Sequence, residues 1–277
     1  MSTTKSILIT GCSSGIGLCA ARLLRERGYR VFATARQAGD VERLVSEGFE
    51  AVRLDLADSA SIQSAVSQVL AASGGSLYGL FNNGAYGQPG AVEDLSRDVL
   101  REQFETNLFG THELTNLVIP VMRRQGYGRI VQNSSVLGFA AMRFRGAYNA
   151  SKFALEGLTD TLRLELIGSG VHVSLVEPGP IQSRFRDNAY RMYLTHIDRE
   201  HSPHRETYQA MEARLQKEGP AVPFTQGPEA VVAKVIHALE ALRPKARYYV
   251  TFPTYLFGYL KRILPDRALD HIVGKVG

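Results

Sequence analysis

Short runs of aliphatic residues recur along the chain, and the segments between them carry apolar residues at helical spacing. The runs are rich in Val, Ile and Leu, which predicts strands. Predicted strands cover residues 7–9, 29–34, 51–54, 77–81, 129–132, 171–176 and 247–251. Predicted helices cover residues 18–24, 41–47, 59–72, 96–124, 146–167 and 228–242.

Strands that alternate with helices in this way are typical of a parallel sheet covered on both faces. The pattern therefore predicts a doubly wound, Rossmann-type α/β fold with a central parallel sheet of about seven strands. The 277 residues, 44% of them hydrophobic, predict a single domain over residues 1–277. Segment 180–226 is charged and aromatic, with one helical stretch near residues 207–217 and no clear strand, which predicts a substrate-binding lid. Residues 252–277 are predicted to form an apolar C-terminal tail.

The net charge of +5 comes from scattered side chains, which suits an anionic cofactor and argues against a nucleic-acid partner. Cys12 and Cys19 form no C-x-x-C motif, and no signal peptide or membrane-spanning run is evident, so we expect a cytoplasmic protein with reduced thiols.

The aromatic segment 248–260 is expected to pack on the pocket or a partner subunit, with peripheral membrane contact as the less favoured alternative. His201 and His204 are assigned to a polar loop, and no metal site is predicted.

A glycine-rich loop follows the first predicted strand and opens onto a helix. Gly11, Gly15 and Gly17 have the spacing G-x-x-x-G-x-G. Backbone N–H groups and the helix dipole at such a position attract an anion, and glycine lets the backbone approach a pyrophosphate. Taken alone, the loop also fits an ordinary strand-to-helix turn.

Tyr148 and Lys152 lie four residues apart, on one face of a predicted helix, and Ser135 lies thirteen residues before Tyr148. A nearby ammonium group favours the phenolate and lowers the pKa of a tyrosine, which otherwise lies near 10. Such a pair can transfer a proton to or from an alcohol oxygen while a hydride moves, and Ser135 can hydrogen-bond that oxygen. The alternative is an ordinary helix face.

In its ordered motifs the sequence resembles the short-chain dehydrogenase/reductase family, compact subtype, over nearly the whole chain. The matching residues are Thr10-Gly11-x-x-x-Gly15-Ile16-Gly17, Asp55, Asn82-Asn83-Gly84-Ala85, Asn107, Ser135, Tyr148-x-x-x-Lys152 and Pro178-Gly179. The amino-acid sequence of the glycine loop is similar to that of hydroxysteroid and retinol dehydrogenases and of bacterial NADP-dependent aldehyde reductases. One departure is Gly84-Ala85, where the family usually has Ala-Gly, so we expect an altered turn beside an intact cofactor site.

The resemblance implies a role for each matching residue. It implies that the catalytic residues are Ser135, Tyr148, Lys152 and Asn107. It implies that the cofactor is bound by Gly11, Ser13, Ser14, Gly15, Ile16, Gly17, Asp55, Leu56, Asn82, Asn83, Tyr148, Lys152, Pro178, Gly179, Ile181 and Ser183. Two of these residues also have a purely structural interpretation. Asn107 could repair a kink in its helix, and Asp55 could be a cap or turn residue.

Arg36 ends the second predicted strand, where an NAD site would carry a carboxylate. A guanidinium there can bind a 2′-phosphate and stack on adenine, so NADP(H) is predicted in preference to NAD(H). The alternative is a surface arginine that merely follows a strand.

Apolar and aromatic residues between Ser135 and Tyr148, and in the lid, predict a bulky apolar carbonyl or alcohol substrate. The predicted substrate residues are Leu137, Phe139, Met142, Phe144, Phe185 and Tyr190. The leading hypothesis is therefore an NADP(H)-dependent oxidoreductase acting on an aldehyde, ketone, retinoid or steroid-like molecule. A non-catalytic cofactor-binding regulator or scaffold is the alternative, a sugar-nucleotide epimerase is disfavoured by the glycine spacing, and the family implies a homodimer or homotetramer.

Overall fold

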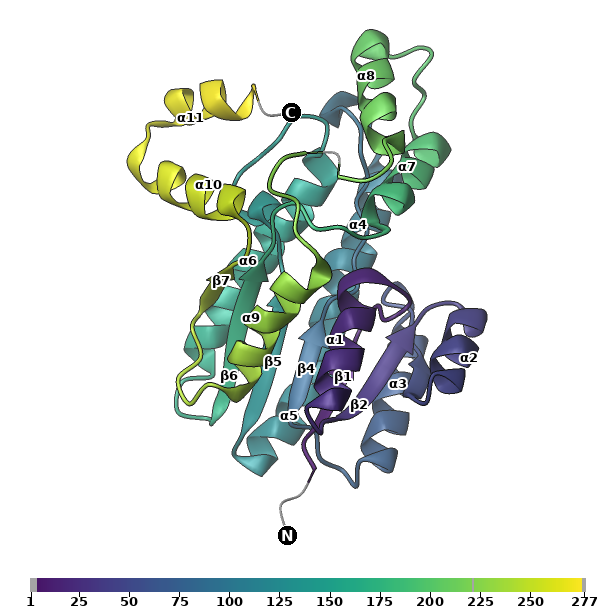
Figure 1. The fold of residues 1–277 in the computed structure, drawn as a ribbon, viewed down its shortest axis with the longest axis vertical. Helices are drawn as coiled ribbons and strands as arrows, with labels where there is room; N and C mark the ends of the chain where they lie inside the picture. The colour runs from purple at the N-terminus through teal and green to yellow at the C-terminus, as the bar shows by residue number, and fades with distance from the viewer. Residues whose placement is uncertain (1–3, 221, 276–277) are drawn as a thin grey trace.

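Seven parallel strands form the centre of the molecule, in the order β3-β2-β1-β4-β5-β6-β7 (Figure 1). Their bounds are β1 Ser6–Ile9, β2 Arg30–Ala35, β3 Glu50–Arg53, β4 Gly79–Asn82, β5 Gly128–Asn133, β6 Val171–Glu177 and β7 Arg247–Tyr249. The structure, a computed structural model, describes residues 4–220 and 222–275. Residues 1–3, 221, 276 and 277 belong to the predicted single domain but lie outside the described residues. The sheet confirms the predicted doubly wound α/β fold.

Successive residues of each strand face opposite layers, because side chains alternate across a sheet. Ile7 and Ile9 face a core built with α1 and α9, whereas Leu8 faces a second core built with α3 and α5. Beside Ile7, a Cβ on Gly79 would lie 3.1 Å from that isoleucine and 3.2 Å from Leu239. Glycine in β4 therefore allows close packing between the sheet and α9.

Helices cover both faces of this sheet (Figure 1). One layer contains α1 Gly15–Glu26, α2 Ala38–Ser46 and α9 Pro228–Glu240. The other contains α3 Ser59–Ala72, α5 Gly110–Gln125 and α6 Gly146–Glu165. The strand order reverses between β1 and β4, and in sheets of this kind a ligand binds at the carboxyl edge beside the reversal.

The helix predicted over residues 96–124 is not one regular helix. It consists of α4 Arg97–Phe104, a π-helical segment Glu105–Phe109 and then α5. A π-turn inserts one residue into the helical repeat and often occurs at functional sites. Gly110 follows directly, and a Cβ there would lie 1.7 Å from the carbonyl oxygen of Leu56.

The predicted lid, residues 180–226, contains two helices where the sequence predicted one. α8 Arg205–Gln216 matches the predicted stretch, and α7 Phe185–His196 was missed. The two ends of the segment are joined, because Gln182 N donates to Gln226 O at 2.9 Å and Gln226 N donates to Pro180 O at 3.1 Å. Segment 180–226 is therefore a closed loop with helices of its own.

The predicted C-terminal tail is also helical. It forms α10 Phe252–Ile263 and α11 Asp266–Val273. Figure 1 shows α7–α8 and α10–α11 on either side of the carboxyl ends of the strands. Both pairs of helices thus stand at the edge of the sheet where the predicted site residues gather.

Candidate active site

The loop between β1 and α1 places glycine where its conformation or its size is required. Gly11 and Gly15 have φ angles of +70° and +55°, in the region that favours glycine. A Cβ on Gly17 would lie 2.2 Å from the carbonyl oxygen of Gly11. Within the described part of the chain, the side chain of Ser14 does not cap α1, so the first turn offers its N–H groups to an anion. This cradle fits a pyrophosphate.

Ser13 and Ile16 complete the predicted phosphate-binding set, and Ser183 is predicted to lie near the nicotinamide carboxamide or the phosphates. The carbonyl of Ser13 accepts a 2.7 Å hydrogen bond from Nη2 of Arg43. Ile16 packs against the core beneath α1, and the Cβ of Ser183 would lie 3.0 Å from a Cβ on Gly15. Ser183 therefore approaches the loop from the lid side.

The segment after β4 is fastened to the glycine loop by Thr10. The Thr10 hydroxyl accepts hydrogen bonds from the N–H groups of Asn83 and Gly84 at 2.8 and 2.7 Å. The Asn83 side chain donates to the Thr10 carbonyl at 3.1 Å. A Cβ on Gly84 would lie 2.8 Å from Cδ1 of Leu56, so glycine at this departure from the family pattern leaves room for Leu56.

Three of the predicted cofactor residues make structural contacts of their own. Asn82 is buried and donates to the Thr115 hydroxyl at 2.9 Å, which directs it into the core. Asp55 accepts a 3.0 Å bond from Ala57 N, so one of its carboxylate oxygens closes a turn. Leu56 is buried in the core on the α3–α5 face. Asp55 and Leu56 lie at the carboxyl edge beside β3, whereas Asn82 acts from beneath the site.

Two arginines lie on the β2 side of the loop. Arg36 is exposed directly after β2, and its carbonyl accepts a 3.2 Å bond from Arg53. Among the described residues, Arg36 forms no ion pair. Arg43 also reaches the loop, but Asp40 and Glu47 pair with it at 3.1 and 3.0 Å. Of these two arginines, Arg36 is therefore the one without an ion-pair partner among the described residues.

Ser135, Tyr148 and Lys152 come together at the carboxyl ends of β5 and β6. Ser135 follows β5, and its hydroxyl accepts a bond from Leu137 N at 3.1 Å. Tyr148 and Lys152 lie on successive turns of α6, with Nζ of Lys152 5.7 Å from the centre of the tyrosine ring. The ring of Phe185 meets Tyr148 edge-on, with ring centroids 5.3 Å apart.

Burial changes the acidity of both catalytic candidates. It raises the pKa of Tyr148 to about 12, with hydrogen bonding to Ser135 acting in the opposite direction. It lowers the pKa of Lys152 to about 8, while the charge of Glu156 opposes that change. The sequence predicted a lowered pKa for Tyr148. In the protein without a cofactor that pKa is raised instead, because desolvation of the phenol has the largest effect.

A chain of hydrogen bonds joins Lys152 to the glycine loop. Nζ of Lys152 donates to the carbonyl of Asn133 at 2.7 Å, and the side chain of Asn133 donates to Oδ1 of Asn83 at 3.0 Å. Asn83 in turn donates to the carbonyls of Thr10 and Gly11 at 3.1 and 3.4 Å. The lysine and the loop are therefore positioned relative to one another by three side chains.

Asn107 lies in the π-helical segment and is buried. Its Oδ1 accepts from Tyr86 N at 3.2 Å, and its Nδ2 donates to Tyr86 O at 2.9 Å and to the Ser151 hydroxyl at 3.2 Å. Both amide protons are thus engaged. The observed role of Asn107 is to fasten the segment after β4 to α6, while the proposed relay role stays a prediction.

Pro178, Gly179 and Ile181 follow β6 and face the end of β5. The carbonyl of Pro178 accepts from Val136 N at 2.8 Å. A Cβ on Gly179 would lie 2.1 Å from the hydroxyl of Thr251, at the start of α10. Ile181 packs against the core on the α1–α9 face. This segment is therefore held between the serine loop and the first C-terminal helix.

The predicted substrate residues fall into two groups. Leu137, Phe139 and Met142 pack in one apolar cluster with Tyr148, and Phe185 contacts the same tyrosine from the lid. The C-terminal helices complete this cluster with Phe257, Leu260, Leu269, Ile272 and Val273. About half of the apolar cluster beside Tyr148 therefore comes from residues that were predicted only as a tail.

Phe144 and Tyr190 belong to the other group. They pack in the core of the lid with Tyr193, Tyr208 and Met211. The Phe144 ring meets the Tyr208 ring edge-on at 5.8 Å, and the rings of Tyr190 and Tyr193 stack at 6.4 Å. The structure places these two residues in the lid core instead of in the group around Tyr148, because their apolar surfaces hold α7 and α8 together.

The family is decided by comparison with known proteins. The family model described as short chain dehydrogenase matches residues 5–193. The chain belongs to the short-chain dehydrogenases. It is 45% identical over 269 residues to the uncharacterized oxidoreductase YbbO of Escherichia coli, covering 97% of this chain and 94% of that one. It is 34% identical over 260 residues to human 17-beta-hydroxysteroid dehydrogenase type 1, covering 88% and 77%.

Two solved structures share this architecture over most of the chain. One from Burkholderia phymatum, in complex with NAD, has a TM-score of 0.78 at 26% identity and covers 98% of this chain and 95% of its own. A variant of the actinorhodin polyketide ketoreductase with NADPH has a TM-score of 0.72 at 28% identity and covers 89% and 95%. This short-chain dehydrogenase is therefore an oxidoreductase, and these two structural neighbours hold a nicotinamide dinucleotide.

Several residues of this short-chain dehydrogenase's site were missed from the sequence. Thr10 was noted only as part of a motif, and Asn133, Tyr86 and Thr251 were not singled out. Polar residues directly after strands are a usable signal for Thr10 and Asn133. Tyr86 acts through its backbone and Thr251 through a contact distant in sequence, so nothing local reveals them.

Within residues 4–220 and 222–275, no helix has the length and apolar character needed to cross a membrane.

Proposed function

We propose that this short-chain dehydrogenase uses NADP(H) to interconvert a carbonyl and an alcohol on a bulky apolar substrate, with Tyr148 as general acid and base. One observation carries the proposal. Tyr148 is half-buried next to Ser135 and packs against an apolar cluster, while Lys152, one turn along α6, is linked through Asn133 and Asn83 to the glycine loop. A proton donor, an oxygen-binding hydroxyl and a dinucleotide cradle thus meet at one edge of the sheet.

A bound nicotinamide dinucleotide supplies the hydride for reduction and accepts it in oxidation. The first turn of α1 would hold its phosphates, Arg36 its 2′-phosphate and Lys152 its nicotinamide-side ribose. The hydroxyl of Ser135 would orient the substrate oxygen, and Tyr148 would give that oxygen its proton.

The acidity of Tyr148 favours one direction at neutral pH. With a pKa raised by burial to about 12, the phenol keeps its proton and can act as the acid that carbonyl reduction requires. Alcohol oxidation needs the phenolate, so its rate should increase with pH over the range in which reduction stays constant or falls. We therefore propose that the rate of carbonyl reduction, relative to that of alcohol oxidation, is higher at neutral than at alkaline pH.

Two observations support the proposed substrate and cofactor. The human relative is named for a hydroxysteroid, and the apolar cluster around Tyr148 suits a molecule of that character, including long-chain aldehydes, ketones and retinoids. Solved neighbours carry NAD in one case and NADPH in another, and Arg36, which is exposed and forms no ion pair among the described residues, favours NADP(H) here. A cytoplasmic homodimer or homotetramer remains the expected assembly.

The experiment compares the wild type with Tyr148→Phe in an NADPH-oxidation screen of long-chain aldehydes, retinoids, steroids and quinones. We expect the variant to lose about 10²- to 10⁴-fold in turnover, the usual contribution of a general acid, while its Kd for NADPH changes by less than a few-fold. Tyr127→Phe is the matched control, because that tyrosine is exposed directly before β5. Retained turnover in Tyr148→Phe would contradict the proposed role.

The regulator hypothesis has a distinct signature in the same screen. A scaffold would bind NADPH and oxidise none of it with any carbonyl compound, in the wild type as in the variant. The joint presence of Ser135, Tyr148 and Lys152 at the site favours the enzyme.

A further inference from the structure

Behind the proposed catalytic residues, one arginine faces three carboxyl groups. Arg247 begins β7, and its guanidinium lies 3.0 Å from Glu177, 2.9 Å from Glu156 and 2.7 Å from Asp160. Among the described residues, only Asp160 has a second arginine, Arg163 at 2.9 Å. The two glutamates therefore depend on Arg247 for their positive partner.

Glu156 and Glu177 are the buried members of this group. Glu177 ends β6 with no exposed surface, and 9% of the Glu156 side chain is exposed. Among the described residues, Oε1 of Glu156 and both carboxyl oxygens of Glu177 are buried and form no hydrogen bond of ordinary geometry, although Nε of Arg247 lies 3.0 Å from Oε1 of Glu177 and the Ser134 hydroxyl lowers the pKa of Glu156. Two buried carboxylates side by side repel one another, whereas a retained proton lets one carboxyl group donate to the other. Consistently, burial and the charge of Glu156 raise the pKa of Glu177 to about 9.

This carboxyl pair adjoins the proposed catalytic machinery on two sides. Glu156 lies one turn after Lys152 on α6, where its charge opposes the effect of burial on the lysine. A Cβ on Gly138 would lie 3.0 Å from Oε1 of Glu156 and 2.6 Å from the Ser134 hydroxyl, so Glu156 sits behind the loop that carries Ser135. Glu177 directly precedes the Pro178-Gly179 segment.

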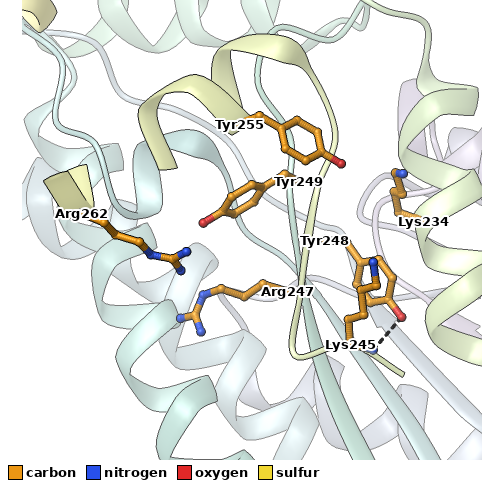
Figure 2. Close-up of a pocket in the computed structure, with 7 residues that line it drawn as sticks. All are labelled: Lys234, Lys245, Arg247, Tyr248, Tyr249, Tyr255 and Arg262. Carbon is orange, nitrogen blue, oxygen red and sulfur yellow. Dashed lines mark hydrogen bonds between the residues drawn. The ribbon is translucent and has the colours of Figure 1, made fainter. Parts of the chain in front are cut away.

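A cavity of about 270 Å³ at β7 gives water access to the outer side of the same arginine. Figure 2 shows Arg247, Tyr249 and Arg262 on one side of this cavity, with Tyr248 and Lys245 on the other. Six charged or titratable groups surround the pair or its arginine: Lys152, Asp160 and Arg163 on α6, Arg247 and Tyr249 on β7, and Arg262 on α10. The pair is thus buried, yet near a route by which it can exchange a proton with solvent.

We propose that Glu156 and Glu177 hold one proton between them and act as positioning residues that keep Lys152 in its ammonium form. With one proton retained on Glu177, the pair carries a single negative charge, which lies on Glu156. Arg247 balances this charge, and the charge also favours the ammonium form of Lys152. The inference rests on the proposed roles of Tyr148 and Lys152, but the shared proton is a property of the folded chain that can be measured without any substrate.

The first measurement is infrared spectroscopy of the full chain at pH 7. The wild type should show the carbonyl stretch of a protonated carboxyl group, and the band should disappear on titration toward pH 10. Glu177→Gln should lack that band, because the amide replaces the acid while keeping a donor for Glu156. Absence of the band in the wild type, or its persistence in Glu177→Gln, would overturn the proposal.

The second measurement is the pH profile of kcat/KM for carbonyl reduction. Glu156→Gln should move the alkaline limb down by about one pH unit. Loss of an opposite charge one helical turn away should lower the pKa of Lys152 by about that much or more. Glu177→Gln should keep the limb in place, whereas Glu177→Leu, which cannot donate to Glu156, should shift it. Asp160→Asn is the control: it shares Arg247 but lies a further turn away and half-exposed, so its limb should not move.

The possible failures are distinguishable. An unmoved limb in Glu156→Gln would refute the positioning role even if the infrared band is present. Full turnover in Tyr148→Phe together with the band would refute the proposed function and leave the shared proton standing. Should Glu156→Gln not fold, the infrared comparison of the wild type with Glu177→Gln still decides whether the proton is shared.

Discussion

The side-chain amide of Asn107 pairs with both backbone polar groups of Tyr86, accepting from its N–H at 3.2 Å and donating to its carbonyl at 2.9 Å. An amide side chain can imitate a backbone neighbour in this way, and here it does so at the segment that follows β4. Because Asn107 lies on the π-turn, the irregular helix and the edge of the dinucleotide cradle are joined by one residue.

Asn107→Ala should therefore loosen the cradle as well as the fold. The N–H of Tyr86 loses its acceptor, at a cost of about 1–3 kcal/mol, whereas the Tyr86 carbonyl still accepts from the side chain of Gln103 at 2.9 Å. We expect a lower free energy of unfolding in urea and a several-fold higher Kd for NADPH. The control is Asn116→Ala, on the exposed side of the following helix, which should change neither quantity. An unchanged Kd in Asn107→Ala would show that Tyr86 is held by other contacts.

Gly110 and Gly157 make a matched pair of helical glycines. A Cβ on Gly110 would lie 1.7 Å from the Leu56 carbonyl oxygen, whereas a Cβ on Gly157 meets nothing within 4 Å. Gly157→Ala should stabilise the protein by about 0.5–1 kcal/mol through helix propensity. Gly110→Ala should destabilise it severely, because backbone must move on both sides. Thermal unfolding measures both, and equal effects would contradict the close approach of α5 to Leu56.

Arg36→Asp tests the cofactor preference. A charge-assisted hydrogen bond contributes about 1.5–3 kcal/mol, which corresponds to a loss of roughly tenfold to a hundredfold in kcat/KM for NADPH. The value for NADH should fall far less, or rise. Arg124→Asp makes the same change of net charge at an exposed position in the last turn of α5 and should leave the NADPH/NADH ratio unaltered. An unchanged ratio in Arg36→Asp would show that another group selects the cofactor.

The C-terminal helices offer a test of the substrate wall. Leu269 packs with Tyr148 and Phe139 in one cluster, whereas 75% of Ile263 is exposed. Leu269→Ser should raise KM for an apolar carbonyl substrate several-fold and leave KM for NADPH unchanged. Ile263→Ser removes a similar apolar group from the same part of the chain and should alter neither constant. A rise in both constants for Leu269→Ser would indicate general unfolding of the site.

The sheet was predictable because its strands are continuous apolar runs, and Tyr148 with Lys152 because a four-residue spacing fixes one helix face. The Lys152–Asn133–Asn83 chain was not, since it joins residues from three elements whose pairing depends on the folded sheet. The same is true of Arg247, which meets Glu156 about 90 positions away in the sequence.

Helices α7, α10 and α11 were missed for a different reason. Their apolar surfaces are mixed with charged and aromatic residues, so the local pattern resembles a loop or a tail. These segments become regular only by packing on partners such as Tyr208 or Leu137, because tertiary contacts supply most of the stability of a short helix. The acidity of Tyr148 belongs to this class too, since burial depends on the whole fold.

The apolar neighbours contributed by α10 and α11 lie beyond residue 193, where the family match ends. Part of the apolar surface around Tyr148 thus comes from a stretch of the chain separate from the one that carries the proposed catalytic residues. We expect the final helices to be exchangeable as a cassette, giving an enzyme with a different choice of substrate and the same hydride chemistry.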